Sequence, residues 1–306
     1  MTPVRIFVFV AMLFGLAFIL ATPPIRIPDE QGHYLRSVLV AAGLFGGDRN
    51  ERDAVWLPKK VASDFDDFSG RAHEVMRGRP FDFDEITNRM HGSGPRETDL
   101  ARRVVPAAQM IPDGIGYLPP AIAYEIAMKA GGTFIESLWA ARFAVLLTSV
   151  LITALALLLM PAWARWTGVA VNLLPMAVYM RAALSPDAVV TAVTVLGISA
   201  FLSGAKRNDF SWSSSMIAFT ACAYLAVVKP PYACILLLSL LWVPFGDPRS
   251  AHPRIIIAAV AVMWVATFAV AAWHSEHVAY YVARMRPDLA PAEYAAESVV
   301  SQRLVE

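Results

Sequence analysis

The chain has 306 residues, of which 57% are hydrophobic and 17% charged, and its mean hydropathy is +0.50. Soluble domains are roughly half apolar and a quarter charged, so this composition, gathered into long apolar blocks, indicates a polytopic membrane protein. The net charge of +1 excludes the strongly basic surface that nucleic-acid binding requires.

The first apolar block, RIFVFVAMLFGLAFILA at 5–21, is about as long as a minimal transmembrane helix. Arg5 before a short apolar core is also typical of a signal peptide. Pro23-Pro24 is a poor cleavage context, however, so residues 1–21 are interpreted as an uncleaved first transmembrane helix.

The next segment, 22–137, is expected to be one long outer (periplasmic) loop. Its middle is polar, and DFDDF at 64–68 and FDFDE at 81–85 alternate aromatic and acidic residues, which is interpreted as a solvated loop. Near its end, 118–131 is too short to span a bilayer and is expected to form an interfacial helix. A loop this long is unusual unless it is functional or disordered.

Residues 28–42, near the start of this loop, are expected to form the other juxtamembrane helix. Pro28 suits a first helical position. The apolar residues Leu35, Val38 and Leu39 predict that this helix lies along the membrane surface.

Six more apolar blocks follow the loop and predict a six-helix transmembrane bundle over 138–273. When the N-terminus is placed in the cytoplasm, the basic residues of the short loops gather on the cytoplasmic side, as expected for membrane proteins. The segment 274–306 is then an outer C-terminal segment. The expected spans are 138–160, 166–182, 186–204, 212–228, 231–246 and 254–273.

The helix at 28–42 carries four ionisable residues, Asp29, Glu30, His33 and Arg36. Asp29, His33 and Arg36 have the spacing i, i+4, i+7, which places them on one side. The acids could simply stabilise the helix start and pair with Arg36. A Glu-x-x-His pair could bind a metal, although the stretch supplies too few sure ligands. The third interpretation is a general base beside a cation, the arrangement needed for group transfer to a hydroxyl.

Four further ionisable residues interrupt the apolar blocks: Arg142, Arg181, Asp187 and Lys229. Such residues are costly in a membrane and are usually functional. The expected topology places all four at the outer ends of their spans, on the side of the 28–42 helix. Snorkelling or helix capping explains each one separately. Together they predict a polar cleft suited to a phosphate-bearing substrate.

Sequence motifs of other chemistries are absent. The chain has no GxGxxG, P-loop, HExxH or GxSxG motif, which argues against nucleotide chemistry. Cys222 and Cys234 lie in apolar blocks, so neither a disulfide framework nor a cysteine metal site is expected.

Five stretches resemble, in the same order, those of a bacterial family of predicted membrane proteins, domain of unknown function 2142. That family is similar to the GT-C glycosyltransferases. The resemblance implies a GT-C-like module of one span, a long outer loop with two juxtamembrane helices, and six further spans. The stretches are IPDEQGHYLRSVLVAAG, GYLPPAIAY, AARFAVLL, ALSPDAVV and VVKPPYACILLL.

The resemblance also implies a reaction. A sugar would pass, with inversion, from a polyprenyl-phosphate donor to a hydroxyl of a glycan, lipid or protein acceptor at the outer face of the bacterial inner membrane. Asp29 would be the general base, with Glu30 as its neighbour. The candidate substrate-binding residues are His33, Arg36, Arg142, Arg181 and Lys229, with Asp187 orienting the acceptor or an arginine.

The sequence identifies no certain cofactor, and a divalent metal such as Mg²⁺ or Mn²⁺ is compatible with this chemistry. The chain ends at Glu306, about 30 residues past the last expected span, whereas family chains usually continue. We therefore expect a fragment or a short member lacking an acceptor-binding part. The alternative functions are a transporter or flippase of lipid-linked glycan, and a non-catalytic scaffold of a polymer-assembly complex.

Overall fold

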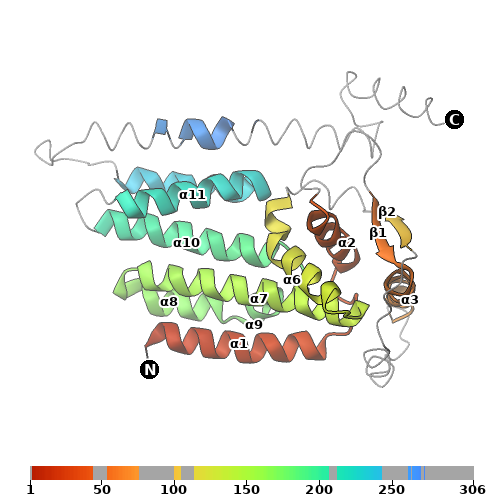
Figure 1. Ribbon diagram of the computed structural model, residues 1–306. Helices are drawn as coiled ribbons and strands as arrows, with labels where there is room; N and C mark the ends of the chain where they lie inside the picture. The colour runs from red at the N-terminus through yellow and green to blue at the C-terminus, as the bar shows by residue number, and fades with distance from the viewer. Residues whose placement is uncertain are drawn as a thin grey trace, which may run out of the picture.

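A computed structural model describes residues 2–43, 54–75, 100–104, 114–206, 212–242 and, near the C-terminus, 261–262, 264–269 and 272. These residues are mainly helical (Figure 1). In chain order the elements are α1 (Pro3–Ala21), α2 (Glu30–Ala41), β1 (Ala54–Pro58), α3 (Lys59–Val75), β2 (Leu100–Val104), η1 (Gly114–Tyr117), α6 (Leu118–Lys129), α7 (Phe134–Leu159), α8 (Ala162–Asn172), α9 (Pro175–Arg181), α10 (Asp187–Lys206), α11 (Trp212–Val228) and η2 (Pro230–Trp242).

Three helices of the described chain are long and apolar enough to cross a membrane. They are α1, α7 and the Asp187–Gly204 part of α10, and two shorter apolar helices occupy Ser213–Val228 and Pro230–Ser239. The expected all-helical membrane architecture is thus confirmed in its general form. The expected span at 254–273 and the segment 274–306 lie largely outside the described residues.

The first helix packs closely on α7. Its buried residues, Phe7, Ala11, Gly15 and Ile19, recur every four positions and therefore form one face. A Cβ added at Gly15 would lie only 2.5 Å from Cδ1 of Leu146, so glycine permits this close approach. The opposite face exposes large apolar side chains, as a lipid-facing surface does.

The span expected at 166–182 is not one continuous helix. It forms α8 and α9, separated at Leu173 and Leu174, and Pro175 begins the second helix. Proline lacks the backbone N–H that would continue the ladder of hydrogen bonds, so the break falls in front of it.

Helix α2 lies at one end of the bundle, beside α6 (Figure 1). The expectation that Leu35, Val38 and Leu39 are exposed as contacts for the membrane surface is wrong, because these side chains are at most 5% exposed. They pack in a core with Phe134 of α7 and Val55 of β1. The protein itself therefore buries the apolar face that seemed available to lipid.

A small outer layer covers α2. Strands β1 and β2 pair antiparallel and precede and follow α3. The stretch 64–68 was expected to be a loop, but it lies on α3 because Phe65 and Phe68, 6% and 2% exposed, fall on its buried face. Asp66 accepts a hydrogen bond of 2.8 Å from Nε of Arg103 on β2. The two-stranded ribbon was not predicted, and 81–85 lies outside the described residues.

Candidate functional site

The predicted base, Asp29, stands immediately before α2. The helix begins at Glu30 rather than at Pro28, and Asp29 adopts a left-handed conformation with φ 60° and ψ 6°. Aspartate and asparagine tolerate this conformation better than most residues. The side chain is exposed and does not cap the helix. Its carboxylate is therefore accessible to a ligand at the end of the bundle.

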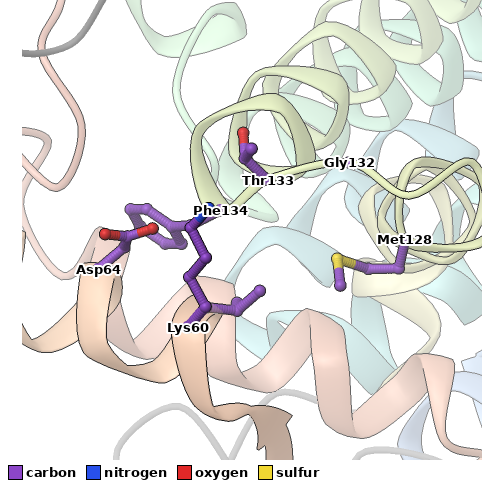
Figure 2. Close-up of a pocket in the computed structure, with 7 residues that line it drawn as sticks. Lys60, Asp64, Met128, Gly132, Thr133 and Phe134 are labelled. Atoms are coloured by element: carbon purple, nitrogen blue, oxygen red, sulfur yellow. The ribbon is translucent and has the colours of Figure 1, made fainter. Parts of the chain in front are cut away.

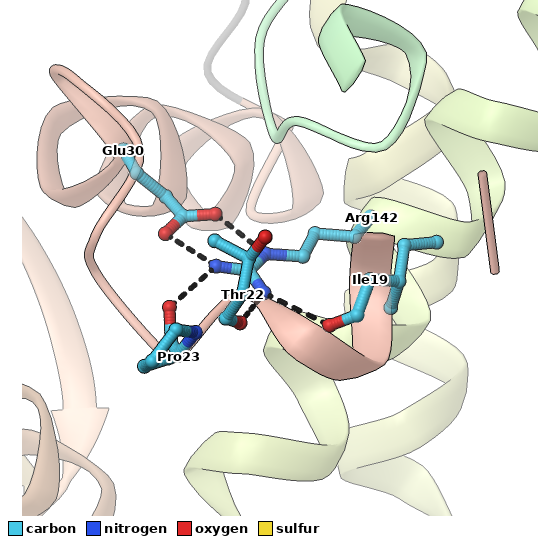
Figure 3. A network of polar contacts seen from close by, with 5 residues as sticks. All are labelled: Ile19, Thr22, Pro23, Glu30 and Arg142. Carbon is cyan, nitrogen blue, oxygen red and sulfur yellow. Dashed lines mark hydrogen bonds and ion pairs between the residues drawn. The ribbon is translucent and has the colours of Figure 1, made fainter. Parts of the chain in front are cut away.

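The next residue, Glu30, is fully buried and forms a bidentate ion pair with Arg142 of α7 (Figure 3). Nε and Nη2 of Arg142 donate to the two carboxylate oxygens, each at 2.7 Å. The same guanidinium donates to the carbonyl oxygens of Ile19 at 3.4 Å, Thr22 at 2.7 Å and Pro23 at 3.0 Å. One side chain thus joins α7 to the end of α1 and the start of α2.

This network leaves little for a substrate. A guanidinium has five N–H donors, and Arg142 makes five hydrogen bonds within the protein. The geometry therefore does not favour the expected contact between Arg142 and a lipid phosphate. Glu30, whose two oxygens are both occupied, is equally unsuited to act as a second base.

On the exposed side of α2, His33 contacts Tyr117, the last residue of η1. Nδ1 of His33 lies 2.7 Å from the phenol oxygen. The two rings are 5.7 Å apart between centroids. Tyr117 is 1% exposed, whereas His33 is only partly buried. Sequence reasoning missed this partner, although Tyr117 stands in the quoted stretch GYLPPAIAY.

Asp187 and Lys229 form an ion pair whose charges also act on His33. Asp187 is the first residue of α10 and Lys229 follows the last residue of α11. Their side chains are 36% and 41% exposed, and Nζ lies 2.5 Å from Oδ1. Nζ also lies 5.7 Å from the centre of the Tyr232 ring.

The charges of this region act on the His33–Tyr117 pair. Burial lowers the pKa of His33; the Asp187 and Asp29 carboxylates raise it and Lys229 lowers it, but burial has the largest effect. Burial also raises the pKa of Tyr117 well above its usual value. The phenol therefore keeps its proton, and the imidazole is held towards its neutral form.

Arg36 and Arg181 are both buried, at different places. Arg36 is 0% exposed and lies near enough to Tyr117 for its charge to lower the phenol pKa. Arg181 instead donates to Oδ1 of Asn172 at 2.6 Å and to Oγ1 of Thr153 at 3.4 Å.

These contacts place Arg181 away from the Glu30–Arg142 ion pair. Thr153 follows Arg142 by eleven positions on α7, which is a rise of about 16 Å along the helix. Arg181 also donates to the carbonyl oxygens of Asn172 at 2.9 Å and Ala177 at 3.0 Å, on the two sides of the break between α8 and α9. The charges of Asp29, Asp187 and Lys229 thus act on His33, whereas Arg181 bridges the interrupted helix.

A small recess lies elsewhere, between α3 and the turn from α6 to α7 (Figure 2). Lys60 and Asp64 of α3 face Met128, Thr133 and Phe134 across it. The recess has a cavity volume of only about 10 Å³, far below the roughly 300–1,000 Å³ of small-molecule pockets. It contains none of the predicted site residues.

No group of three or more histidine, cysteine, aspartate or glutamate side chains with metal-site geometry occurs among the described residues.

A comparison with protein families matches the family described as "Predicted membrane protein (DUF2142)" over residues 12–286. The chain belongs to this family. The comparisons with curated proteins and with solved structures each found no match. As a DUF2142 protein with several apolar helices, the chain is a multi-pass membrane protein in contact with the lipid bilayer.

Proposed function

We propose that this protein is a membrane glycosyltransferase that moves a sugar from a polyprenyl-phosphate donor to an acceptor hydroxyl. The observation that carries the proposal is the position of Asp29. Its carboxylate is exposed at the start of α2, and its charge and those of Asp187 and Lys229 act on His33. An exposed carboxylate and a partly exposed cation that both act on His33 could supply the base and the anion contact that such a transfer needs.

In the proposed reaction, Asp29 takes the proton of the acceptor hydroxyl. The hydroxyl oxygen forms a bond to the anomeric carbon, and the bond from that carbon to the lipid phosphate oxygen breaks. The electron pair stays on the phosphate, and attack from the opposite side inverts the anomeric configuration. Lys229 has three N–H donors and stabilises the charge that develops on the leaving phosphate.

The roles of the buried arginines differ from the first expectation. Glu30 and Arg142 hold the link between α1 and α2, on which Asp29 stands, and Arg181 holds the two halves of an interrupted span. Neither arginine contacts the donor phosphate in this account. Asp187 keeps Lys229 in place through the ion pair between them.

The proposal includes a membrane arrangement. Seven spans cross the bacterial inner membrane, with the N-terminus in the cytoplasm. The loop that carries α2, α3, β1, β2 and α6 then lies on the outer side, where lipid-linked sugar donors and envelope acceptors meet. The resemblance to GT-C enzymes supports this arrangement.

A transporter or flippase of lipid-linked glycan is the second candidate. The break between α8 and α9, bridged by buried Arg181, favours it, because discontinuous membrane helices with polar groups line many transport sites. The partly exposed Asp187 and Lys229 lie instead at the start of α10 and after the end of α11, where Gly116 of η1 packs on their chain neighbours, and this position favours the transferase.

One experiment distinguishes the candidates. The purified protein is reconstituted in proteoliposomes with polyprenyl-phosphate-linked radiolabelled sugar and an envelope extract that supplies acceptors. A transferase releases polyprenyl phosphate and forms a new labelled product. Movement of intact lipid-linked sugar across the bilayer without bond cleavage would support transport. If the protein neither transfers the sugar nor moves the donor across the bilayer, and also does not bind the donor, the result would support a scaffold.

A further inference from the structure

We propose that Tyr117 is a positioning residue for His33. Its phenol donates a hydrogen bond to Nδ1, so that the imidazole presents Nε2–H to an oxygen of the donor phosphate. The tautomer follows from the hydrogen bond between a protonated phenol and a neutral imidazole, whereas the identity of the ligand rests on the proposed function.

The direction of the hydrogen bond follows from counting donors and acceptors. A protonated phenol has one O–H to donate. For Tyr117, which is 1% exposed, the described residues offer a single acceptor within reach, Nδ1 of His33 at 2.7 Å. If Nδ1–H donated instead, the phenol proton would be buried without an acceptor, which costs about 1–3 kcal/mol. Nδ1 is therefore the acceptor, and a neutral ring must carry its proton on Nε2.

The phenol is held in place on several sides. Its side chain packs with Val40 of α2 and Ala121 of α6. The preceding residue, Gly116, approaches two other elements closely, since an added Cβ would lie 3.0 Å from Cγ1 of Val228 and 3.2 Å from Cβ of Pro186. These two neighbours directly precede Lys229 and Asp187 in the chain. Packing at Gly116 thus fixes the distance between Tyr117 and the ion pair.

The other ring nitrogen, Nε2, is available to a ligand. No atom of the described chain forms a hydrogen bond with it, and His33 is only partly buried. The titratable and charged groups that act on the ring or on its partner are Asp29, Asp187, Lys229 and, through Tyr117, Arg36. Burial outweighs them and lowers the pKa of His33.

This arrangement gives His33 a role distinct from that of Asp29. A neutral imidazole with its proton on Nε2 has its only available lone pair on Nδ1, and that lone pair accepts the hydrogen bond of Tyr117, so the ring cannot act as a base towards a ligand at Nε2. It serves instead as a neutral hydrogen-bond donor, while Asp29 remains the base. A neutral donor and the cation of Lys229 can then bind different oxygens of one phosphate.

The test is the tautomer of His33, measured by ¹⁵N NMR on the full chain in nanodiscs with ¹⁵N-labelled histidine. The signals of His33 are those lost in His33→Gln. In the wild type we expect a protonated Nε2 and an unprotonated Nδ1. In Tyr117→Phe we expect the Nδ1–H form to appear and the pKa of His33 to rise, because the hydrogen bond that stabilises the neutral ring is lost.

Tyr124→Phe is the matched control, since Tyr124 lies on the adjoining α6 and packs against Tyr34 rather than His33. It should leave the His33 signals unchanged. A protonated Nδ1 in the wild type would overturn the proposal, even if Tyr117→Phe failed to fold. An unchanged tautomer and pKa in a folded Tyr117→Phe would also overturn it.

The ligand is tested separately with polyprenyl phosphate in the nanodisc and with inorganic phosphate in the buffer. A shift of the Nε2 signal with polyprenyl phosphate supports the assignment. A response to inorganic phosphate alone, or no response to either, overturns the assignment of the ligand. Because these readouts need no turnover, an inactive protein with the expected tautomer would count against the proposed function only.

Discussion

Arg142 on α7 and Glu30 on α2 are 112 positions apart in sequence and form a fully buried, bidentate ion pair. The pair places the start of α2 against the membrane bundle. Because Glu30 directly follows Asp29, it also fixes the backbone that carries the proposed base. We therefore expect that breaking the pair lowers the stability of the fold, and that any loss of activity follows from this loss of stability.

Arg142→Met should lower stability strongly, because it leaves the Glu30 carboxylate buried without its cation. Removing one partner of a buried pair costs about 3–5 kcal/mol. Thermal unfolding of the purified protein in detergent measures the effect. The control is Lys129→Met, which removes an exposed ion pair with Glu125 worth at most about 0.5 kcal/mol. Equal melting temperatures for the two variants would refute the structural role.

Gly116→Ala should reduce activity by displacing Tyr117 from His33. The new methyl group would press on Val228 and Pro186 at 3.0 and 3.2 Å, distances that require the neighbours to move. The matched control is Gly70→Ala on α3, where nothing lies within 4 Å of an added Cβ. Sugar transfer and the His33 NMR signals would both be measured. Wild-type behaviour of a folded Gly116→Ala protein would contradict the importance of this contact.

Lys229 and Arg181 should respond differently to substitution. Lys229→Met should weaken binding of the polyprenyl-phosphate donor about ten- to a hundredfold, because it removes a charge-assisted hydrogen bond of about 1.5–3 kcal/mol. Arg181→Met should lower the melting temperature, since Arg181 bonds both sides of the helix break, but leave donor affinity unchanged. Titration calorimetry and thermal unfolding separate the two effects. A loss of donor affinity in a folded Arg181→Met protein would mean that Arg181 takes part in binding the donor after all.

His33 should make stability depend on pH. Its pKa is lowered by burial in the folded protein, while in the unfolded chain it stays near 6.5. Below about pH 6.5 the unfolded state therefore binds more protons, and stability falls until the folded-state pKa is reached.

The measurement is the melting temperature between pH 5 and 8 for the wild type and His33→Gln. The difference between the two proteins isolates His33 from the other histidines. We expect the advantage of the wild type to shrink as the pH falls below 6.5. An advantage that grows at low pH would mean that the carboxylates of Asp29 and Asp187 outweigh burial.

The sequence predicted the parts of this fold that depend on local pattern. Long apolar blocks gave α1, α7 and most of α10, and the charges after the first block marked the region of α2 correctly. The burial of α2 could not be seen, because Leu35, Val38 and Leu39 look the same whether they face lipid or a protein layer. That layer includes α3, which was not predicted as a helix because acidic residues alternate with Phe65 and Phe68 in this stretch.

The site was predicted in outline only. Asp29, Asp187 and Lys229 were expected on the same side as His33, and all three are near enough for their charges to act on its ring. The partners of Arg142 and Arg181 were not visible, since carbonyl oxygens of Thr22 or Asn172 carry no sequence signal. Tyr117 was overlooked because one tyrosine before a proline pair indicates a helix start more readily than a contact with a histidine 84 positions earlier.

The central claim, that Asp29 is the general base, is tested most directly by Asp29→Asn. Asparagine has nearly the same shape and tolerates the left-handed conformation at φ 60° equally well, so only the carboxylate is lost. The control is Glu125→Gln on α6, which removes an exposed carboxylate paired with Lys129.

The measurement is sugar transfer from a polyprenyl-phosphate donor in proteoliposomes. The account predicts that Asp29→Asn folds and binds donor like the wild type but forms no product, while Glu125→Gln retains full activity. Full transfer activity in Asp29→Asn would contradict it.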